Sequence, residues 1–273
     1  MLDYEEEAGG YDATRGGEPR AAAAANAVLG LIPDRAGQPG GLPGRPGRLL
    51  DLGCGTGIVT RRLAAARPGL RVTGADRAHA MARTAAARLP GAVVRADGRR
   101  LPFPDATFDA VTTVWLLHLA RDGAEAREIV AECARVLRPG GVYVTTVDKA
   151  AAHDVGSDID AVLAGRPRRP PPDAAADVTA HARHSGLSPA GQAAFPGLGQ
   201  GRSPRSTIAD LRRGWFTALR PDDPRVAEFA ARLAALPDQD RRRPDPRFTL
   251  RAFTKADPRP APVRRPYRSG RPG

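Results

Sequence analysis

Residues 49–57 read LLDLGCGTG, and this stretch decides the fold. An apolar run passes through Asp51 into a turn that contains Gly53, Gly55 and Gly57. Glycines let the backbone turn sharply and let a ligand approach the main chain closely. The helix expected next offers its N-terminal amides to an anionic group. Nicotinamide dehydrogenases have a different spacing, G-x-G-x-x-G, so the stretch predicts a strand, a ligand-binding turn and a helix of another class.

Strands and helices are predicted to alternate around this turn. We expect strands at 48–52, 70–75, 92–96, 108–114 and 142–147, and helices at 20–31, 56–66, 78–89 and 124–137. Five alternations are typical of an α/β fold with a doubly wound parallel sheet.

The pattern is less regular after residue 149. Helices are expected at 158–164, 174–185, 207–219 and 225–236, and a strand within 189–203. Residues 247–255, RFTLRAFTK, alternate as an edge strand does.

Composition places the chain among ordinary globular proteins. It has 273 residues, of which 41% are hydrophobic and 26% charged. Its two cysteines, Cys54 and Cys133, provide neither a disulfide framework nor a zinc site, and we expect no metal. No stretch is long and apolar enough to span a membrane, and the acidic start MLDYEEEAGG lacks the apolar core of a secretory signal. We therefore expect a cytoplasmic protein with no membrane partner.

Positive charge is concentrated near the C-terminus. The net charge is +12, and residues 239–273 contain 11 basic and three acidic residues. The Pro/Arg-rich segment 257–273 has too few apolar residues to order itself, so a disordered tail is predicted there. An RNA contact is the alternative, but only Tyr267 is available there for base stacking, and we do not expect a nucleic-acid partner.

Acidic residues follow the next two predicted strands. Asp76 closes the second strand and can accept hydrogen bonds from two ribose hydroxyls. Asp97 and Gly98 close the third strand, where they can accept a hydrogen bond from an adenine amino group. Ligands of such sheets bind at the carboxyl ends of the strands, so these residues predict a nucleoside site beside the glycine turn.

Together these motifs resemble a known family. DLGCGTG, Asp76, Asp97-Gly98, LPFPDATFD at 101–109 and LRPGG at 137–141 look like the motifs of class I S-adenosylmethionine-dependent methyltransferases. The group is the small-molecule one, methyltransferase type 11 or UbiE-like, with actinobacterial natural-product methyltransferases among its members. The resemblance implies a Rossmann-like, doubly wound seven-stranded sheet, mostly parallel with an antiparallel last strand. S-adenosylmethionine is the implied cofactor and S-adenosylhomocysteine its product.

The resemblance also implies a domain organisation and a role for each motif residue. Residues 1–44 would form an N-terminal helical lid, 45–150 the cofactor-binding core, and 151–256 the rest of the domain with acceptor-pocket insertions. Asp76 would bind the ribose. The methionine moiety would be lined by Asp51, Gly53, Cys54, Gly55 and Gly57. The adenine would be contacted by Arg77, Met81, Asp97 and Gly98. Met81 is alternatively a core residue, and for Cys54 we favour a small buried spacer.

The N-terminal stretch 11–17, YDATRGG, is similar to a segment that folds over the cofactor in this group. Arg15 would pair with the cofactor carboxylate, a task that suits a guanidinium, and Tyr11 would border the methyl group. The alternative is a disordered N-terminus.

The reaction centre is expected after the fourth strand, at TVWLLHL, residues 113–119. His118 is a candidate general base because an ordinary histidine is neutral near pH 7. Trp115 would form one wall of the pocket that binds an aromatic acceptor. His153, Asp148 and Tyr11 are weaker alternatives for the base.

Three functions are compatible with these features. The first is methyl transfer to a small aromatic or heterocyclic acceptor in specialised metabolism. By resemblance of YDATRGG and WLLH, this includes an indole carbon of a tryptophan-derived cyclodipeptide. The second is an RNA methyltransferase that uses the basic C-terminal region, and the third is a non-catalytic cofactor-binding protein. For the first we expect a small-molecule acceptor and a monomer or homodimer.

Overall fold

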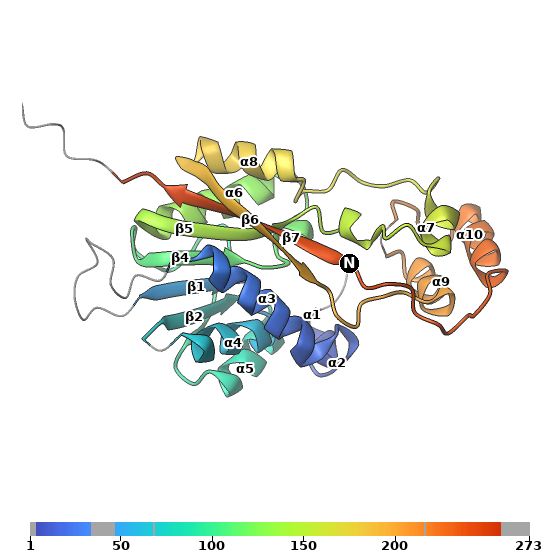
Figure 1. The fold of residues 1–273 in the computed structure, drawn as a ribbon, viewed down its shortest axis with the longest axis horizontal. Coiled ribbons are helices and arrows are strands. Elements are labelled where there is room, and N and C mark those ends of the chain that lie inside the picture. Colours follow the sequence, from blue (N-terminus) through green and yellow to red (C-terminus); the bar gives the residue numbers. More distant parts are fainter. Residues whose placement is uncertain (1–3, 34–46, 68, 216, 258–273) are drawn as a thin grey trace, which may run out of the picture.

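A seven-stranded sheet in the order β3-β2-β1-β4-β5-β7-β6 forms the centre of the protein (Figure 1). The computed structural model describes residues 4–33, 47–67, 69–215 and 217–257. The strands are β1 (Arg48–Leu52), β2 (Arg71–Asp76), β3 (Val93–Arg95), β4 (Phe108–Thr113), β5 (Leu137–Val147), β6 (Leu187–Pro196) and β7 (Arg247–Lys255). The first five pair in parallel, and β7 lies antiparallel between β5 and β6. The predicted sheet, with its antiparallel last strand, is confirmed.

Helices cover both faces of the sheet, as the alternation predicts. Neighbouring residues of a strand point to opposite faces, and Leu49 and Leu50 accordingly belong to two separate apolar clusters. The cluster of Leu49 includes residues of α3 (Gly17–Leu31) and α4 (Ile58–Ala66). The cluster of Leu50 includes residues of α6 (Gly123–Val136) and α8 (Ala175–His184). Helix α5 (His79–Arg88) contacts β2 and β3.

Three further helices gather beyond the end of the sheet where β1, β4 and β5 finish (Figure 1). They are α7 (Asp158–Leu163), α9 (Pro204–Arg212) and α10 (Pro224–Ala234), and they share an apolar cluster of their own. Short elements precede and connect these parts: α1 (Tyr4–Glu7), α2 (Tyr11–Thr14), η1 (Leu117–Leu119) and η2 (Ala151–His153).

Several element boundaries differ from the predicted ones, among them the start of β6 at Leu187, before the predicted range 189–203. The second half of the expected helix 207–219 is wrong, because α9 ends at Arg212 and the chain turns at Gly214, whose φ is 72°. The helix also starts earlier than expected, after a capping box at Ser203. Helix α3 begins at Gly17 rather than residue 20. Strand β5 begins at Leu137, which pairs with Phe108, so LRPGG lies within the strand.

Some expectations fall on residues that the structure does not describe. The predicted N-terminal region 1–44 includes residues 34–44, and the tail expected at 257–273 includes residues 258–273. Both of these ranges lie outside the described residues. Among the described helices, none is long and apolar enough to cross a membrane.

Candidate functional site

The three glycines of the turn after β1 have two different tasks. All three adopt positive φ angles, 72° at Gly53, 55° at Gly55 and 77° at Gly57. A Cβ atom on Gly53 would lie 2.8 Å from Leu116, and one on Gly57 would lie 2.9 Å from Ala85. A Cβ atom on Gly55 would meet nothing within 4 Å. Packing thus requires glycine at the outer two positions, whereas the backbone of Gly55 faces open space that a ligand can approach.

Asp76 is bound directly to this turn. Its Oδ2 accepts the backbone N–H of Gly55 at 2.8 Å, and its Oδ1 accepts that of Ala78 at 2.9 Å. Burial raises the pKa of the carboxyl group, and the backbone hydrogen bonds oppose that rise. The structure therefore brings together the two motifs that the sequence placed at the ends of adjacent strands. The neighbouring side chain, Arg77, is exposed.

Asp51 lies in the core beneath the turn. Its oxygens accept hydrogen bonds from the hydroxyl groups of Thr60 on α4, at 2.6 Å, and Thr112 on β4, at 2.8 Å. Burial raises the pKa of Asp51 to about 6. The carboxyl group thus joins β1 to a helix and a neighbouring strand and holds the base of the turn. Neither threonine was identified from the sequence.

Two further predicted residues, Cys54 and Met81, are buried. Cys54 is 8% exposed, and its Sγ lies 3.1 Å from where a Cβ atom on Gly74 would be. Burial also raises the pKa of its thiol. Met81 is 1% exposed. Both side chains are as buried as expected for the packing roles that the sequence analysis considered for them.

Asp97, after β3, forms a two-point ion pair with Arg99. The Arg99 Nε lies 3.0 Å from Oδ1, and Nη2 lies 2.6 Å from Oδ2. This arginine lowers the pKa of Asp97 to about 2. A Cβ atom on the adjacent Gly98 would lie 3.4 Å from Leu52. Asp97 is therefore ionised, with both oxygens held by a side chain that the sequence analysis did not identify.

The N-terminal segment is attached to the glycine turn and to α5. The carboxylate of Glu5 accepts the backbone N–H groups of His79 at 2.6 Å and Ala80 at 2.8 Å, at the start of α5. Asp12 accepts the Thr56 hydroxyl at 2.6 Å and pairs with Arg88 at 2.6 Å. Negative charge is favourable at a helix N-terminus, so α1 and α2 have defined anchors. Sequence analysis identified neither carboxylate.

Two further aromatic residues, Tyr4 and Trp215, lie near Tyr11 and Arg15. The rings of Tyr4 and Tyr11 are 6.1 Å apart, and the Arg15 guanidinium lies 5.7 Å from the Tyr11 ring and 5.1 Å from the Trp215 ring. Burial raises the pKa of Tyr4, and the charge of Asp76 acts in the same direction. Tyr4 therefore lies beside Tyr11 and close enough to Asp76 to feel its charge, which its position in the sequence does not reveal.

Trp115 follows β4 with an unusual backbone. Its φ is 55°, a conformation that is rare for a bulky residue, and its N–H donates to the Thr146 hydroxyl at 2.6 Å. The indole packs edge-on against Phe195 and Phe248, each with ring centroids 5.4 Å away. The Arg20 guanidinium lies 4.2 Å above the ring. Trp115 thus belongs to an aromatic cluster at the carboxyl end of the sheet.

The histidines near this cluster are neutral. Burial, with the charge of Lys149 as the next cause, holds the pKa of His118 well below its usual value, and its buried Nδ1 has no hydrogen-bond partner among the described residues. Burial and the charge of Arg202 lower the pKa of His153 to about 2. The His153 ring packs against Phe248 at 5.6 Å. His118 is thus available to accept a proton but is a weaker base than an exposed histidine.

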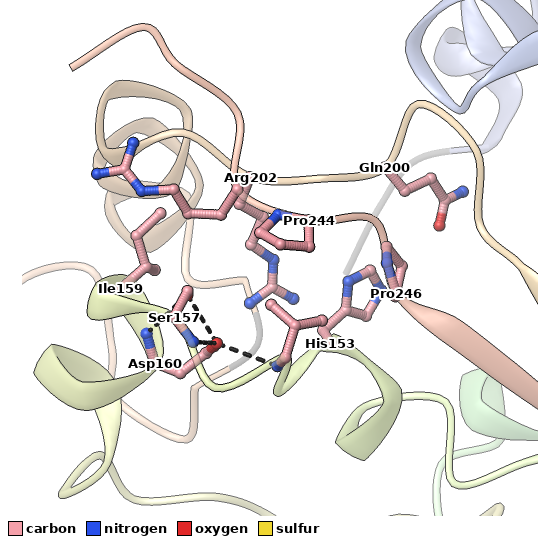
Figure 2. A pocket seen from close by; sticks show the side chains of 10 residues that line it. His153, Ser157, Ile159, Asp160, Gln200, Arg202, Pro244 and Pro246 are labelled. Carbon is pink, nitrogen blue, oxygen red and sulfur yellow. Dashed lines mark hydrogen bonds between the residues drawn. The ribbon is translucent and has the colours of Figure 1, made fainter. Parts of the chain in front are cut away.

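A small cavity borders this region between the segment from His153 to Asp160 and the chain around residues 200–202 and 243–246 (Figure 2). Its volume is about 10 Å³, enough for roughly one water molecule. The lining includes His153, Asp160, Gln200 and Arg202, and the Asp160 carboxylate accepts hydrogen bonds from Val155 and Ser157. No residue of the glycine turn lines it. Gln200 also donates to the Arg15 carbonyl at 3.2 Å, so the loop after β6 contacts the N-terminal segment.

The residues fit a nucleoside-bearing cofactor better than a metal ion. An open glycine backbone stands beside a carboxyl group at the ends of two parallel strands, as a ribose site requires. In the described ranges, no group of three or more histidine, cysteine, aspartate or glutamate side chains is placed to hold a metal.

Comparisons with known proteins agree with this geometry. Residues 50–145 match the family model described as a methyltransferase domain. The ubiquinone/menaquinone biosynthesis C-methyltransferase UbiE of Desulfotalea psychrophila is 38% identical over 110 residues, which are 39% of this chain and 42% of that protein. The 27-O-demethylrifamycin SV methyltransferase of Amycolatopsis mediterranei is 35% identical over 120 residues, 42% of this chain and 40% of that protein. The chain thus spans about two fifths of the length of these curated relatives.

A solved structure shares the fold over a longer stretch. It is a complex between the Haloferax volcanii Trm112 methyltransferase activator and a putative methyltransferase. Its TM-score is 0.56 at 19% identity, and the match covers 94% of this chain and 99% of that one.

Proposed function

We propose that this chain, which carries the domain of the class I S-adenosylmethionine-dependent methyltransferases, methylates a small aromatic or heterocyclic molecule. The observation that carries the proposal is the contact between Asp76 and Gly55 beneath the N-terminal segment. This contact supports the proposal, because it joins a carboxyl group to an open backbone where the resemblance expects the cofactor.

The chain's residues have distinct proposed tasks toward the cofactor. Asp76 accepts hydrogen bonds from the ribose hydroxyls, while Gly53, Gly55 and Gly57 let the methionine part approach the backbone. Asp51 supports the glycine turn from beneath, because its carboxyl group accepts hydrogen bonds from two threonines. Arg15 pairs with the cofactor carboxylate, and Tyr11 with Tyr4 covers the site from above.

S-adenosylmethionine supplies a methyl group on a sulfonium sulfur, and the acceptor's electron pair forms the new bond as the carbon–sulfur bond breaks and S-adenosylhomocysteine leaves. The main task of the protein is then to position the two molecules in line. An acceptor that must lose a proton would give it to His118, which is neutral. Trp115 lies in the aromatic cluster that would border the acceptor ring.

We further propose a setting in specialised metabolism, with an indole carbon of a tryptophan-derived cyclodipeptide as one acceptor. The support is the resemblance of YDATRGG and WLLH, together with the aromatic cluster around Trp115. A cytoplasmic monomer or homodimer suits this role. The RNA alternative uses the basic C-terminal region, of which residues 258–273 lie outside the described part, and no described observation favours it.

Calorimetry and product analysis test the proposal. Titration of the full chain should show binding of S-adenosylmethionine and S-adenosylhomocysteine, and none of NAD. Incubation with deuteromethyl-labelled S-adenosylmethionine and a metabolite panel should yield labelled small molecules in mass spectra. Binding of NAD in place of S-adenosylmethionine would disprove the proposed function.

A further inference from the structure

Arg20 is a buried cation that forms no ion pair with any described residue. It is 5% exposed, and no described residue bonds to its Nε. One face of the guanidinium lies over the Trp115 ring at 4.2 Å, and the Tyr11 side chain acts on it as a hydrogen-bond partner. The oxygens of Asp12, a carboxylate that raises the Arg20 pKa, are held by Thr56 and Arg88. Because burial of an uncompensated charge is unfavourable, an anion that reaches this guanidinium would be bound favourably.

Lys149, just after β5, has a similar environment. Within the described ranges its ammonium group forms no ion pair. The charge of Asp173 raises the Lys149 pKa, but the hydrogen bond between the two residues is one that Asp173 accepts from the Lys149 backbone N–H at 2.9 Å. Three arginines, Arg15, Arg20 and Arg202, lie close enough to lower the pKa of Lys149. Four cations from distant parts of the chain therefore share one region.

Trp115 and Lys149 lie apart from the predicted nucleoside-binding groups, although Arg15, whose charge also acts on Lys149, is a predicted cofactor residue. The glycine turn, Asp76 and Asp97 follow β1, β2 and β3, whereas Trp115 and Lys149 follow β4 and β5 on the other side of β1. In such sheets the ligand lies across the carboxyl ends of the strands. The cations near the ends of β4 and β5 therefore lie at the half of the site that the cofactor leaves free for the acceptor.

We propose that Arg20 and Lys149 bind an anionic group of the methyl acceptor, a carboxylate or a phosphate. This inference rests on the proposed function and narrows its acceptor to molecules that carry a negative charge. A guanidinium offers a planar pair of donors for such an oxyanion, and the ammonium adds a point charge. The aromatic cluster around Trp115 then contacts the apolar part of the same molecule.

The test titrates the full chain, saturated with S-adenosylhomocysteine, with inorganic pyrophosphate and separately with benzoate at low salt. We expect one saturable site for at least one of these probes. Arg20→Gln and Lys149→Met should each weaken that binding by about tenfold or more, as loss of a hydrogen bond to a charged group does. The matched control is Arg71→Gln, an exposed arginine at the amino end of β2, which should change nothing.

The comparison of probes and variants decides the outcome. Binding of pyrophosphate alone indicates a phosphate-bearing acceptor, and binding of benzoate alone a carboxylate. Arg20→Lys preserves the charge and replaces the glutamine variant if that variant does not fold. Equal weakening by Arg71→Gln, or binding of neither probe, would overturn the proposal.

The cofactor titration separates this proposal from the proposed function. Loss of S-adenosylhomocysteine affinity in the Arg20 and Lys149 variants would mean that these cations hold the cofactor carboxylate, which also overturns the inference. If the unmodified chain binds no S-adenosylhomocysteine, the proposed function fails. The anion titration without cofactor then still reports on the cationic site.

Discussion

The backbone N–H of Gly55 donates a 2.8 Å hydrogen bond to Oδ2 of Asp76, and the two residues come from different strand ends. The contact couples the shape of the glycine turn to the charge of a carboxyl group. A ligand that bonds to Asp76 therefore acts on the turn as well.

Substitution of Asp76 should test the ribose assignment. We expect Asp76→Ala to weaken S-adenosylmethionine binding by about 1–3 kcal/mol, because charge-assisted hydrogen bonds are lost. Calorimetry measures this, with Asp222→Ala as a control, since Asp222 is an exposed aspartate. Unchanged affinity in a folded variant would refute the assignment.

Asp51 should make the stability of the protein depend on pH. Its pKa is about 6 in the folded chain, above the ordinary value of 3.8, so between these values the folded state binds more protons than the unfolded state. The free energy of unfolding should therefore fall as pH rises from about 4 to about 6, by at most roughly 3 kcal/mol. Denaturant unfolding at several pH values measures this slope. Asp51→Asn should lack it, and an equal slope in both proteins would show that another group is responsible.

Removal of the N-terminal segment should impair the site but not the sheet. A deletion of residues 1–15 takes away the Glu5 and Asp12 anchors and keeps α3, which begins at Gly17. We expect a folded protein in which cofactor affinity and turnover fall together, as lesions of a lid produce. Calorimetry and turnover assays check this against Glu6→Ala, a change at an exposed residue of α1. Full turnover in the truncated protein would rule out a lid.

His118 should act without titrating near neutrality. If the acceptor loses a proton, His118→Ala should lower turnover by about 10²–10⁴-fold and leave cofactor affinity nearly unchanged. The pKa of His118 lies well below its usual value, so the base form persists as pH falls and any acid limb should lie well below pH 6.5. His184→Ala, at an exposed histidine, is the control.

Other results for His118 have distinct meanings. Weaker acceptor binding with turnover retained would make His118 an orienting group and Tyr11 or His153 the next candidate base. If neither quantity changes, His118 has only a packing role and positioning alone accounts for transfer.

Local patterns were enough to predict the framework. LLDLGCGTG, the alternation of strands with helices, and the period-two pattern of 247–255 predicted the strands of the sheet, while the antiparallel direction of β7 was implied by the family resemblance. The edge position expected for 247–255 is wrong, because β7 lies between β5 and β6. They succeed because burial on one or two faces imposes a periodicity that neighbouring residues reveal. The same reasoning overextended the helix at 207–219, since apolar spacing alone does not show where Gly214 turns the chain.

The partners of the site residues were decided only by the tertiary structure. Arg20 lies over Trp115, 95 residues away in the sequence, and Glu5 reaches the start of α5, 74 residues away. The pKa values of Asp51, His118 and Lys149 depend mainly on burial, which every surrounding element contributes to. A sequence specifies which groups can ionise. Whether they do so near neutral pH depends on the water that folding removes and on the charges it brings close.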